Sequence, residues 1–336
     1  MNCLATLRAA VIWPQRRITL NRLDQRNGYC LTATTGAMWV PHTRNWNGRI
    51  DRMMSNLRRA VFAGLRWCAI PILILTSAAA EAASVEEDMV WTGGLRSAYF
   101  GDRAITQSDD LIILNAPRRG EDAAIVPISI TAQIPQTAEQ YIQTIYLFID
   151  KNPGPLIGKF RFTPKSGRAD LAFRVRVNAY SPIRAIAETN DGELYMSRRF
   201  IKATGGCSAP ASSDLDAAMA RLGKIKLHTI SVPKLAEPTL TQLMISHPNL
   251  SGMQMDQVTH LYAPAHFVRH VKVSFGGQEV FSAETGFGIS ENPSFRFFFV
   301  PESEGELTAE ITDTKGLQFS QTLQVAPIGR QDLVRN

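Results

Sequence analysis

Phe173-Arg174-Val175-Arg176-Val177-Asn178 is the stretch that decides the fold, because apolar and polar side chains alternate along it one by one. A period of two puts the apolar side chains on one face of a β-strand and the polar side chains on the other. Residues 159–162, Lys-Phe-Arg-Phe, show the same alternation. The pattern predicts half-buried antiparallel strands with Arg174 and Arg176 on the polar face.

Further strands are predicted on both sides of that stretch, and they form two groups. Apolar or β-branched runs bounded by turn residues mark them, near 125–130, 141–149, 182–188 and 194–201 in the first group and near 271–275, 295–300 and 317–325 in the second. Residues 209–238 between the groups resemble a loop with one short helix at 214–222. We therefore expect an all-β chain with two β-sandwich modules in tandem, joined by a short helix-containing connector.

The N-terminal region has the composition of an export signal. Residues 53–83 begin with arginines, continue with the apolar run 68–76 and end in small residues that suit a signal peptidase. The apolar run is shorter than the about 20 residues that span a bilayer as a helix, although a retained anchor is the alternative. We expect 53–83 to be a signal peptide and 1–52 to be upstream translation from a misassigned start.

Charge is unevenly distributed along the chain. Of its 36 basic and 30 acidic residues, 11 and three lie in residues 1–83, which leaves 25 basic and 27 acidic residues in 84–336. The net charge of +6 therefore belongs to the N-terminal region. The mature chain is not basic, so we predict neither nucleic-acid binding nor membrane binding after signal cleavage.

Cysteine usage singles out one residue. Cys3, Cys30 and Cys68 all precede residue 84, so Cys207 is the only thiol of the expected mature chain. An intramolecular disulfide cannot form there. An unpaired cysteine in an exported protein suggests a reactive thiol or pairing with another molecule.

The segment Thr204-Gly205-Gly206-Cys207-Ser208 surrounds that thiol. Glycine lacks a Cβ and leaves the backbone free to move, so Gly205 and Gly206 are predicted to form a hinge that extends Cys207 away from the body of the protein. The alternative is a buried or incidental cysteine at a domain boundary.

Three basic residues precede the segment: Arg198, Arg199 and Lys202. Nearby positive charge lowers the pKa of a thiol, so these residues are candidates for supporting a thiolate or attracting an anionic substrate. The alternative is a solvated charged face of a strand.

Motifs for metal binding and catalysis are not evident. Among His247, His260, His266 and His270, only the last two have the spacing of ligands on one helix face, and on a strand four residues span about 13 Å. We therefore predict no metal site. The sequence has no nucleophile elbow, phosphate loop, dinucleotide fingerprint or c-type haem motif. We expect no turnover of its own, with a cysteine hydrolase as the weaker alternative.

Motifs in both halves resemble a known pair of proteins. The second half closely resembles SoxZ through Ser246-His247-Pro248, Pro264-Ala265-His266-Phe267-Val268 and Gly288-Ile289-Ser290-Glu291-Asn292-Pro293-Ser294-Phe295-Arg296-Phe297. The first half resembles SoxY through Ala104-Ile105-Thr106, Ala124-Ile125-Val126-Pro127, Asn152-Pro153 and the Gly-Gly-Cys element. The resemblance divides the chain into a SoxY-like module at 91–208, the connector at 209–238 and a SoxZ-like module at 239–328.

The resemblance implies immunoglobulin-like sandwiches and a carrier function. In the family the two proteins form a periplasmic heterodimer, and the SoxY cysteine carries sulfur intermediates covalently on a C-terminal arm. This chain resembles fused versions that are associated with quinoprotein dehydrogenases. It implies Cys207 as the attachment point, two docked modules, and no intrinsic cofactor other than the sulfur adduct. The implied partners are Sox-type enzymes, a quinoprotein dehydrogenase or a c-type cytochrome.

The chain departs from the family pattern at Cys207. In SoxY the cysteine lies almost at the free C-terminus, whereas here Ser208-Ala209-Pro210 and a further module follow it. An arm tethered at both ends has less reach and a larger cross-section, which puts entry into narrow Sox-type active sites in doubt. The alternative function is a non-covalent adaptor for a periplasmic quinoprotein dehydrogenase or its cytochrome.

Overall fold

The computed structural model describes residues 88–210, 215–255 and 260–329. These residues all belong to one compact unit of the chain, Pro71–Asn336. The predicted upstream segment 1–52 and the predicted signal peptide 53–83 lie outside the described residues. None of the helices within the described ranges has the length and apolar character needed to cross a membrane.

The first half begins with two short helical segments and continues as strands. The π-helix η1 (Trp91–Leu95) leads directly into α2 (Arg96–Phe100), and η2 (Pro164–Ser166) is a single 3₁₀ turn. The strands of this half are β1 (Thr106–Gln107), β2 (Ile112–Asn115), β3 (Val126–Ala132), β4 (Ile142–Ile149), β5 (Leu156–Phe162), β6 (Leu171–Val175), β7 (Ser181–Thr189) and β8 (Leu194–Ile201).

The second half follows a short helix, α3 (Leu215–Ala220), in the predicted connector. Its strands are β9 (Ile225–Thr229), β10 (Thr239–Ile245), β11 (Val268–Phe275), β12 (Gln278–Thr285), β13 (Ser294–Phe299), β14 (Gly305–Asp313) and β15 (Gln318–Val325). The helix agrees with the sequence pattern, but β9 lies inside the stretch 209–238 where only a loop and a helix were predicted. Its burial is shallow, with Leu227 its one buried residue, which explains the weak sequence signal.

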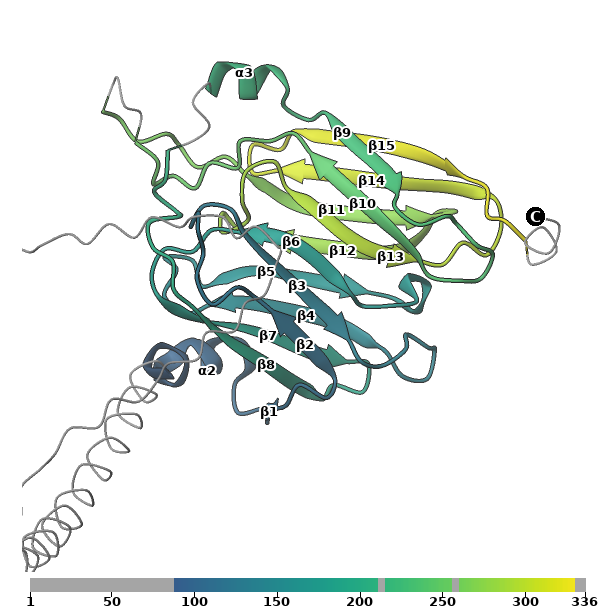
Figure 1. Ribbon diagram of the computed structural model, residues 1–336, viewed down its shortest axis with the longest axis horizontal. Helices are drawn as coiled ribbons and strands as arrows, with labels where there is room; N and C mark the ends of the chain where they lie inside the picture. The colour runs from purple at the N-terminus through teal and green to yellow at the C-terminus, as the bar shows by residue number, and fades with distance from the viewer. Residues whose placement is uncertain (1–87, 211–214, 256–259, 330–336) are drawn as a thin grey trace, which may run out of the picture. The chain divides into compact units, whose positions relative to one another are not determined.

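The strands of the two halves join into two continuous sheets (Figure 1). One sheet has the order β1-β8-β7-β4-β5-β12-β11-β14-β15, and the other has the order β2-β3-β6-β13-β10-β9. The halves meet where β5 pairs with β12 and where β6 pairs with β13, both antiparallel. The predicted all-β fold with two immunoglobulin-like halves is confirmed, and the halves share backbone hydrogen bonds as well as a side-chain interface.

Phenylalanine side chains from both halves fill the space between the sheets at this junction. The ring of Phe160 lies 4.9 Å from that of Phe173 and 6.5 Å from that of Phe281 between centroids, and Phe173 lies 5.9 Å from Phe295. All four side chains are buried. Aromatic pairs at these distances stabilise beyond the area that they bury. The junction between the halves is therefore part of the hydrophobic core.

The alternation of β6 is observed, but the environment of Arg176 differs from the prediction. Phe173 and Val175 face the core as expected, and Arg174 is half-buried. Arg176 is only 1% exposed, so the prediction of a half-buried strand with Arg176 on its polar face was wrong at this position. The reason is that β6 ends at Val175 and the backbone N–H of Arg176 donates to Gly288 O of the second half at 2.7 Å. The second half therefore supplies one of the contacts that surround this position.

Candidate functional site

Cys207 lies in a turn after β8 and is fully buried, with 0% of its surface exposed. It is a free thiol. The prediction that the cysteine extends away from the body of the protein does not describe this conformation. The segment 205–207 instead packs against residues of both halves, which we call the thiol seat: Ala123, Arg176, Val177, Asn178 and Ser251.

Backbone hydrogen bonds hold the segment in the thiol seat. The N–H of Gly205 donates to Asn178 O and the N–H of Gly206 donates to Val177 O, each at 2.9 Å. From the second half, the Ser251 hydroxyl donates to Cys207 O at 2.6 Å. Because each half supplies contacts, closing the thiol seat requires the two halves to be docked.

The two glycines have different structural roles in this conformation. A Cβ at Gly206 would lie 2.0 Å from Ala123 O, a backbone atom that cannot move aside cheaply. Gly205 has a φ of +82° and open space around it. Gly206 therefore permits close backbone packing, and Gly205 supplies a left-handed backbone conformation. Their role as a hinge stays a prediction.

Arg176 is the basic residue whose charge acts on the Cys207 thiol. Its Nη1 donates to Gly206 O at 3.2 Å, while Nε and Nη2 have no hydrogen-bond partner among the described residues. Burial raises the pKa of Cys207 to about 11, and the charge of Arg176 only partly opposes that rise. The thiol is thus neutral at neutral pH in the closed seat. Sequence reasoning missed Arg176, which lies 30 residues before Gly206.

The three basic residues predicted to support the thiolate lie elsewhere. Arg199 Nη2 lies 2.8 Å from Asp109 Oδ2, and Arg198 Nη2 lies 3.3 Å from Asp88 Oδ1. Lys202 is exposed, and its backbone N–H donates to Arg118 O. The electrostatic influence on Cys207 comes from Arg176 instead, because the chain folds the end of β6 under the segment 205–207.

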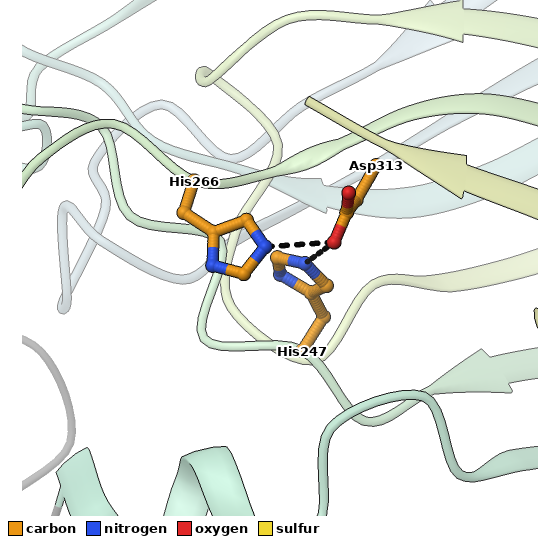
Figure 2. Close-up of side chains that lie close together, drawn as sticks. All are labelled: His247, His266 and Asp313. Atoms are coloured by element: carbon orange, nitrogen blue, oxygen red, sulfur yellow. Dashed lines mark hydrogen bonds and ion pairs between the residues drawn. The ribbon is translucent and has the colours of Figure 1, made fainter. Parts of the chain in front are cut away.

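A second buried cluster joins His247, His266 and Asp313 in the second half (Figure 2). Asp313 Oδ2 lies 2.7 Å from His266 Nε2 and 3.6 Å from His247 Nε2. The sequence did not bring these residues together, because Asp313 ends β14 while both histidines lie in loops. His260 and His270, which were weighed with them, are exposed.

The hydrogen bonds around His247 decide what this cluster can do. The backbone N–H of Asn249 donates to His247 Nδ1 at 3.0 Å, so the ring proton is on Nε2, the atom that faces Asp313. A metal-binding histidine normally donates its second ring N–H, whereas here the second nitrogen accepts. The arrangement is a buried His-Asp-His group in which His266 is hydrogen-bonded to Asp313 and His247 lies at ion-pair distance from the same carboxylate oxygen.

Burial and hydrogen bonding move the pKa values of this cluster. Burial, with a contribution from His266, lowers the pKa of His247 to about 4. Burial alone would raise the pKa of Asp313, but hydrogen bonds from His266 and from the backbone of Leu317 and Lys315 outweigh it and lower that pKa. The folded state therefore contains a neutral His247 beside an ionised Asp313.

The protein should lose stability as the pH falls from 6.5 towards 4. Unfolded His247 binds a proton near its ordinary pKa of 6.5, whereas folded His247 resists protonation down to about 4. The free energy of unfolding is expected to drop by about 2 kcal/mol between pH 7 and pH 5 from this residue alone. Urea unfolding at the two pH values measures it. The drop should be smaller in His247→Gln and unchanged in His228→Gln, an exposed control; equal drops in all three proteins would contradict the assignment.

Comparisons with known proteins agree with this layout. The chain matches the family model of the sulfur oxidation protein SoxY over residues 96–207 and that of the sulphur oxidation protein SoxZ over residues 230–324. The SoxY match ends at Cys207, and the SoxZ match contains the His247, His266 and Asp313 cluster. A search of curated proteins found no match.

Solved structures similar to the chain include a carrier and an enzyme. The sulfur carrier protein SoxY from Chlorobium limicola f thiosulfatophilum is 25% identical, with 38% of this chain and 98% of that chain covered and a TM-score of 0.28. The superoxide reductase (neelaredoxin) from Ignicoccus hospitalis is 18% identical, with 29% and 94% covered and a TM-score of 0.26. On the evidence of the two family matches, the chain carries a SoxY domain followed by a SoxZ domain and is a fused SoxYZ-like sulfur carrier.

Proposed function

We propose that the protein holds a sulfur-containing intermediate covalently on Cys207 and presents it to partner redox enzymes in the periplasm. The observation that carries the proposal is the position of the thiol: the SoxY match ends on Cys207, and it is the free cysteine of the described residues. The matches to the SoxY and SoxZ families support a carrier over a cysteine hydrolase.

Covalent carriage on a buried thiol requires two conformations of the segment 205–207, one closed and one open. A thiol that is buried and whose pKa is raised to about 11 is a poor nucleophile, because only the thiolate attacks sulfur. Loading and unloading therefore take place after the segment 205–207 leaves the thiol seat, with Gly205 and Gly206 as the hinge. The closed seat is the storage form, in which solvent and unrelated thiols do not reach Cys207.

The opening motion is that of a loop and not of a free arm. The chain enters the segment from β8 and continues from it through α3 to β9, so both ends are fixed in the sheets. A loop of this kind suits a partner with an open docking face. Sox-type enzymes, a quinoprotein dehydrogenase and a c-type cytochrome are the proposed partners, and export through residues 53–83 places the carrier in the same compartment.

Intact-mass measurement of protein purified from the periplasm tests covalent carriage. We expect a mass excess that reductant removes, that is lost in Cys207→Ser and that is retained in Ser208→Ala, whose exposed side chain lies next to the thiol. No adduct on the wild-type protein, together with full function of Cys207→Ser in cells, would contradict carriage and indicate a non-covalent adaptor.

A further inference from the structure

The guanidinium of Arg176 is buried without the partners that a buried charge normally has. Its residue is 1% exposed, and Nε and Nη2 donate to no acceptor among the described residues. Among those residues no carboxylate lies within ion-pair distance of it; Glu291 and Asp122 act on it only through their electric field. Buried donors on a charged group are destabilising when unpaired, so this arrangement calls for a physical explanation.

The position of Arg176 relates it to the carrier segment. Nη1 already donates to Gly206 O at 3.2 Å, and the guanidinium charge acts on the Cys207 thiol. The other polar groups of the thiol seat are used by the backbone: Val177 O and Asn178 O accept the two glycine N–H groups, and Ser251 donates to Cys207 O. The free donors at or beside the seat are Nε and Nη2 of Arg176 and Nε2 of Gln254, whose Oε1 accepts from Ser251; of these, only the donors of Arg176 carry a charge.

These two free donors have the geometry of an anion receptor. Nε–H and the outer N–H of Nη2 lie on one edge of the planar guanidinium and point in parallel, which matches two oxygens of a sulfonate or carboxylate. The neutral thiol offers no such partner. An adduct that ends in a sulfur oxyanion does, and it would neutralise the buried charge.

We propose that Arg176 is the binding residue for an anionic sulfur adduct on Cys207, so that the closed thiol seat selects the charged, loaded form of the carrier. The proposal rests on the proposed function, because it takes Cys207 as the attachment point. The ligand class is a cysteine-linked sulfur oxyanion such as an S-thiosulfonate. A neutral disulfide on the same sulfur gains nothing from Arg176.

To test the effect of adduct charge, Cys207 is loaded chemically with either a charged or a neutral adduct. The full chain is used with Cys3, Cys30 and Cys68 replaced by Ser. In one sample the Cys207 thiolate attacks a central sulfur of tetrathionate; a bond forms between the two sulfurs, the central S–S bond breaks, and thiosulfate leaves with the electron pair. In the other, the thiolate attacks the sulfenyl sulfur of methyl methanethiosulfonate, and methanesulfinate leaves. The products are a charged S-thiosulfonate and a neutral methyl disulfide.

The measurement is the rate at which a reductant removes each adduct, followed by intact mass. We expect removal of the charged adduct to be at least about tenfold faster in Arg176→Met than in the parent, and removal of the neutral adduct to be unchanged. Arg176→Lys keeps the positive charge but loses the two parallel N–H donors, so it should give an intermediate rate of removal of the charged adduct. The surface variant Arg199→Met should behave as the parent.

The ratio of the two removal rates distinguishes the loss of Arg176 binding from misfolding of the variant. A variant whose seat no longer closes would release both adducts faster and leave the ratio unchanged, and an unchanged ratio in both Arg176 variants would overturn the proposal. A change of the ratio in Arg199→Met would also overturn it, because it would show a general field effect. These results do not depend on loading in cells, so failure of the proposed function would be seen separately, as the absence of a native adduct.

Discussion

Gly206→Ala is expected to raise the rate at which Cys207 reacts with a small thiol reagent at pH 7 by about 100-fold. In the closed seat the pKa of the thiol is about 11, compared with 9.0 for an ordinary cysteine, and this lowers the thiolate fraction by about two orders of magnitude. A Cβ at position 206 cannot coexist with Ala123 O at 2.0 Å, so the segment must leave the seat. The thiol then regains both its ordinary pKa and its access to solvent.

Gly205→Asn is the matched control for this experiment. Asparagine tolerates the left-handed conformation that Gly205 adopts, and nothing lies within 4 Å of the added Cβ. The reaction should stay slow in this variant. Both proteins are studied with Cys3, Cys30 and Cys68 replaced by Ser, so that the measured reaction is that of Cys207 alone. If Gly206→Ala reacted as slowly as the parent, the close packing of Gly206 against Ala123 would not be what protects Cys207.

Phe281→Ala should lower the free energy of unfolding by about 3–5 kcal/mol and destabilise both halves together. The side chain is fully buried in β12, 5.4 Å between ring centroids from Phe162 of the first half and 5.1 Å from Phe297 of the second. Its removal leaves a cavity at the junction. Because the sheets are continuous there, the two halves are expected to unfold in one transition.

Two probes in urea unfolding measure this cooperativity. Trp91 is the single tryptophan after residue 83, and its fluorescence reports on the first half. Hydrogen exchange of the β11 and β14 amides reports on the second half. The two midpoints should coincide and should shift together in Phe281→Ala, while Leu317→Ala, at a side chain that is 43% exposed, should shift them little. Two separated transitions would show that the halves are independent domains joined only by the chain.

Some of the predicted strands were recognised as apolar or β-branched runs, and others by an alternation that large apolar residues decide. β5, β6 and β11 alternate phenylalanine or valine with charged side chains, and such a pattern can be recognised within a single strand. β14 was missed because its buried face includes the small Ala309 and its other face carries threonine. β12 was missed because Val280 and Phe281 are both buried in succession, next to the register shift in its pairing with β11.

The candidate site was predictable in its nucleophile but not in its surroundings. Cys207 could be singled out by counting cysteines and by its glycines. Its surroundings come from distant segments: Ala123 and Val177 belong to the first half, and Ser251 joins them only after the halves pair. The same holds for Arg176, since alternation describes the two faces of an isolated strand and not what a second domain later covers.

The continuous sheets also set an order of events during synthesis. β5 and β6 leave the ribosome with unpaired edges, and their partners β12 and β13 begin about 120 residues later, a delay on the order of 6–24 s at ordinary translation rates. Open strand edges are templates for wrong pairing, so the nascent first half is the stage at which this chain most needs a chaperone. The half that contains Cys207 is synthesised first, but its sheets gain their last neighbours only when β12 and β13 follow.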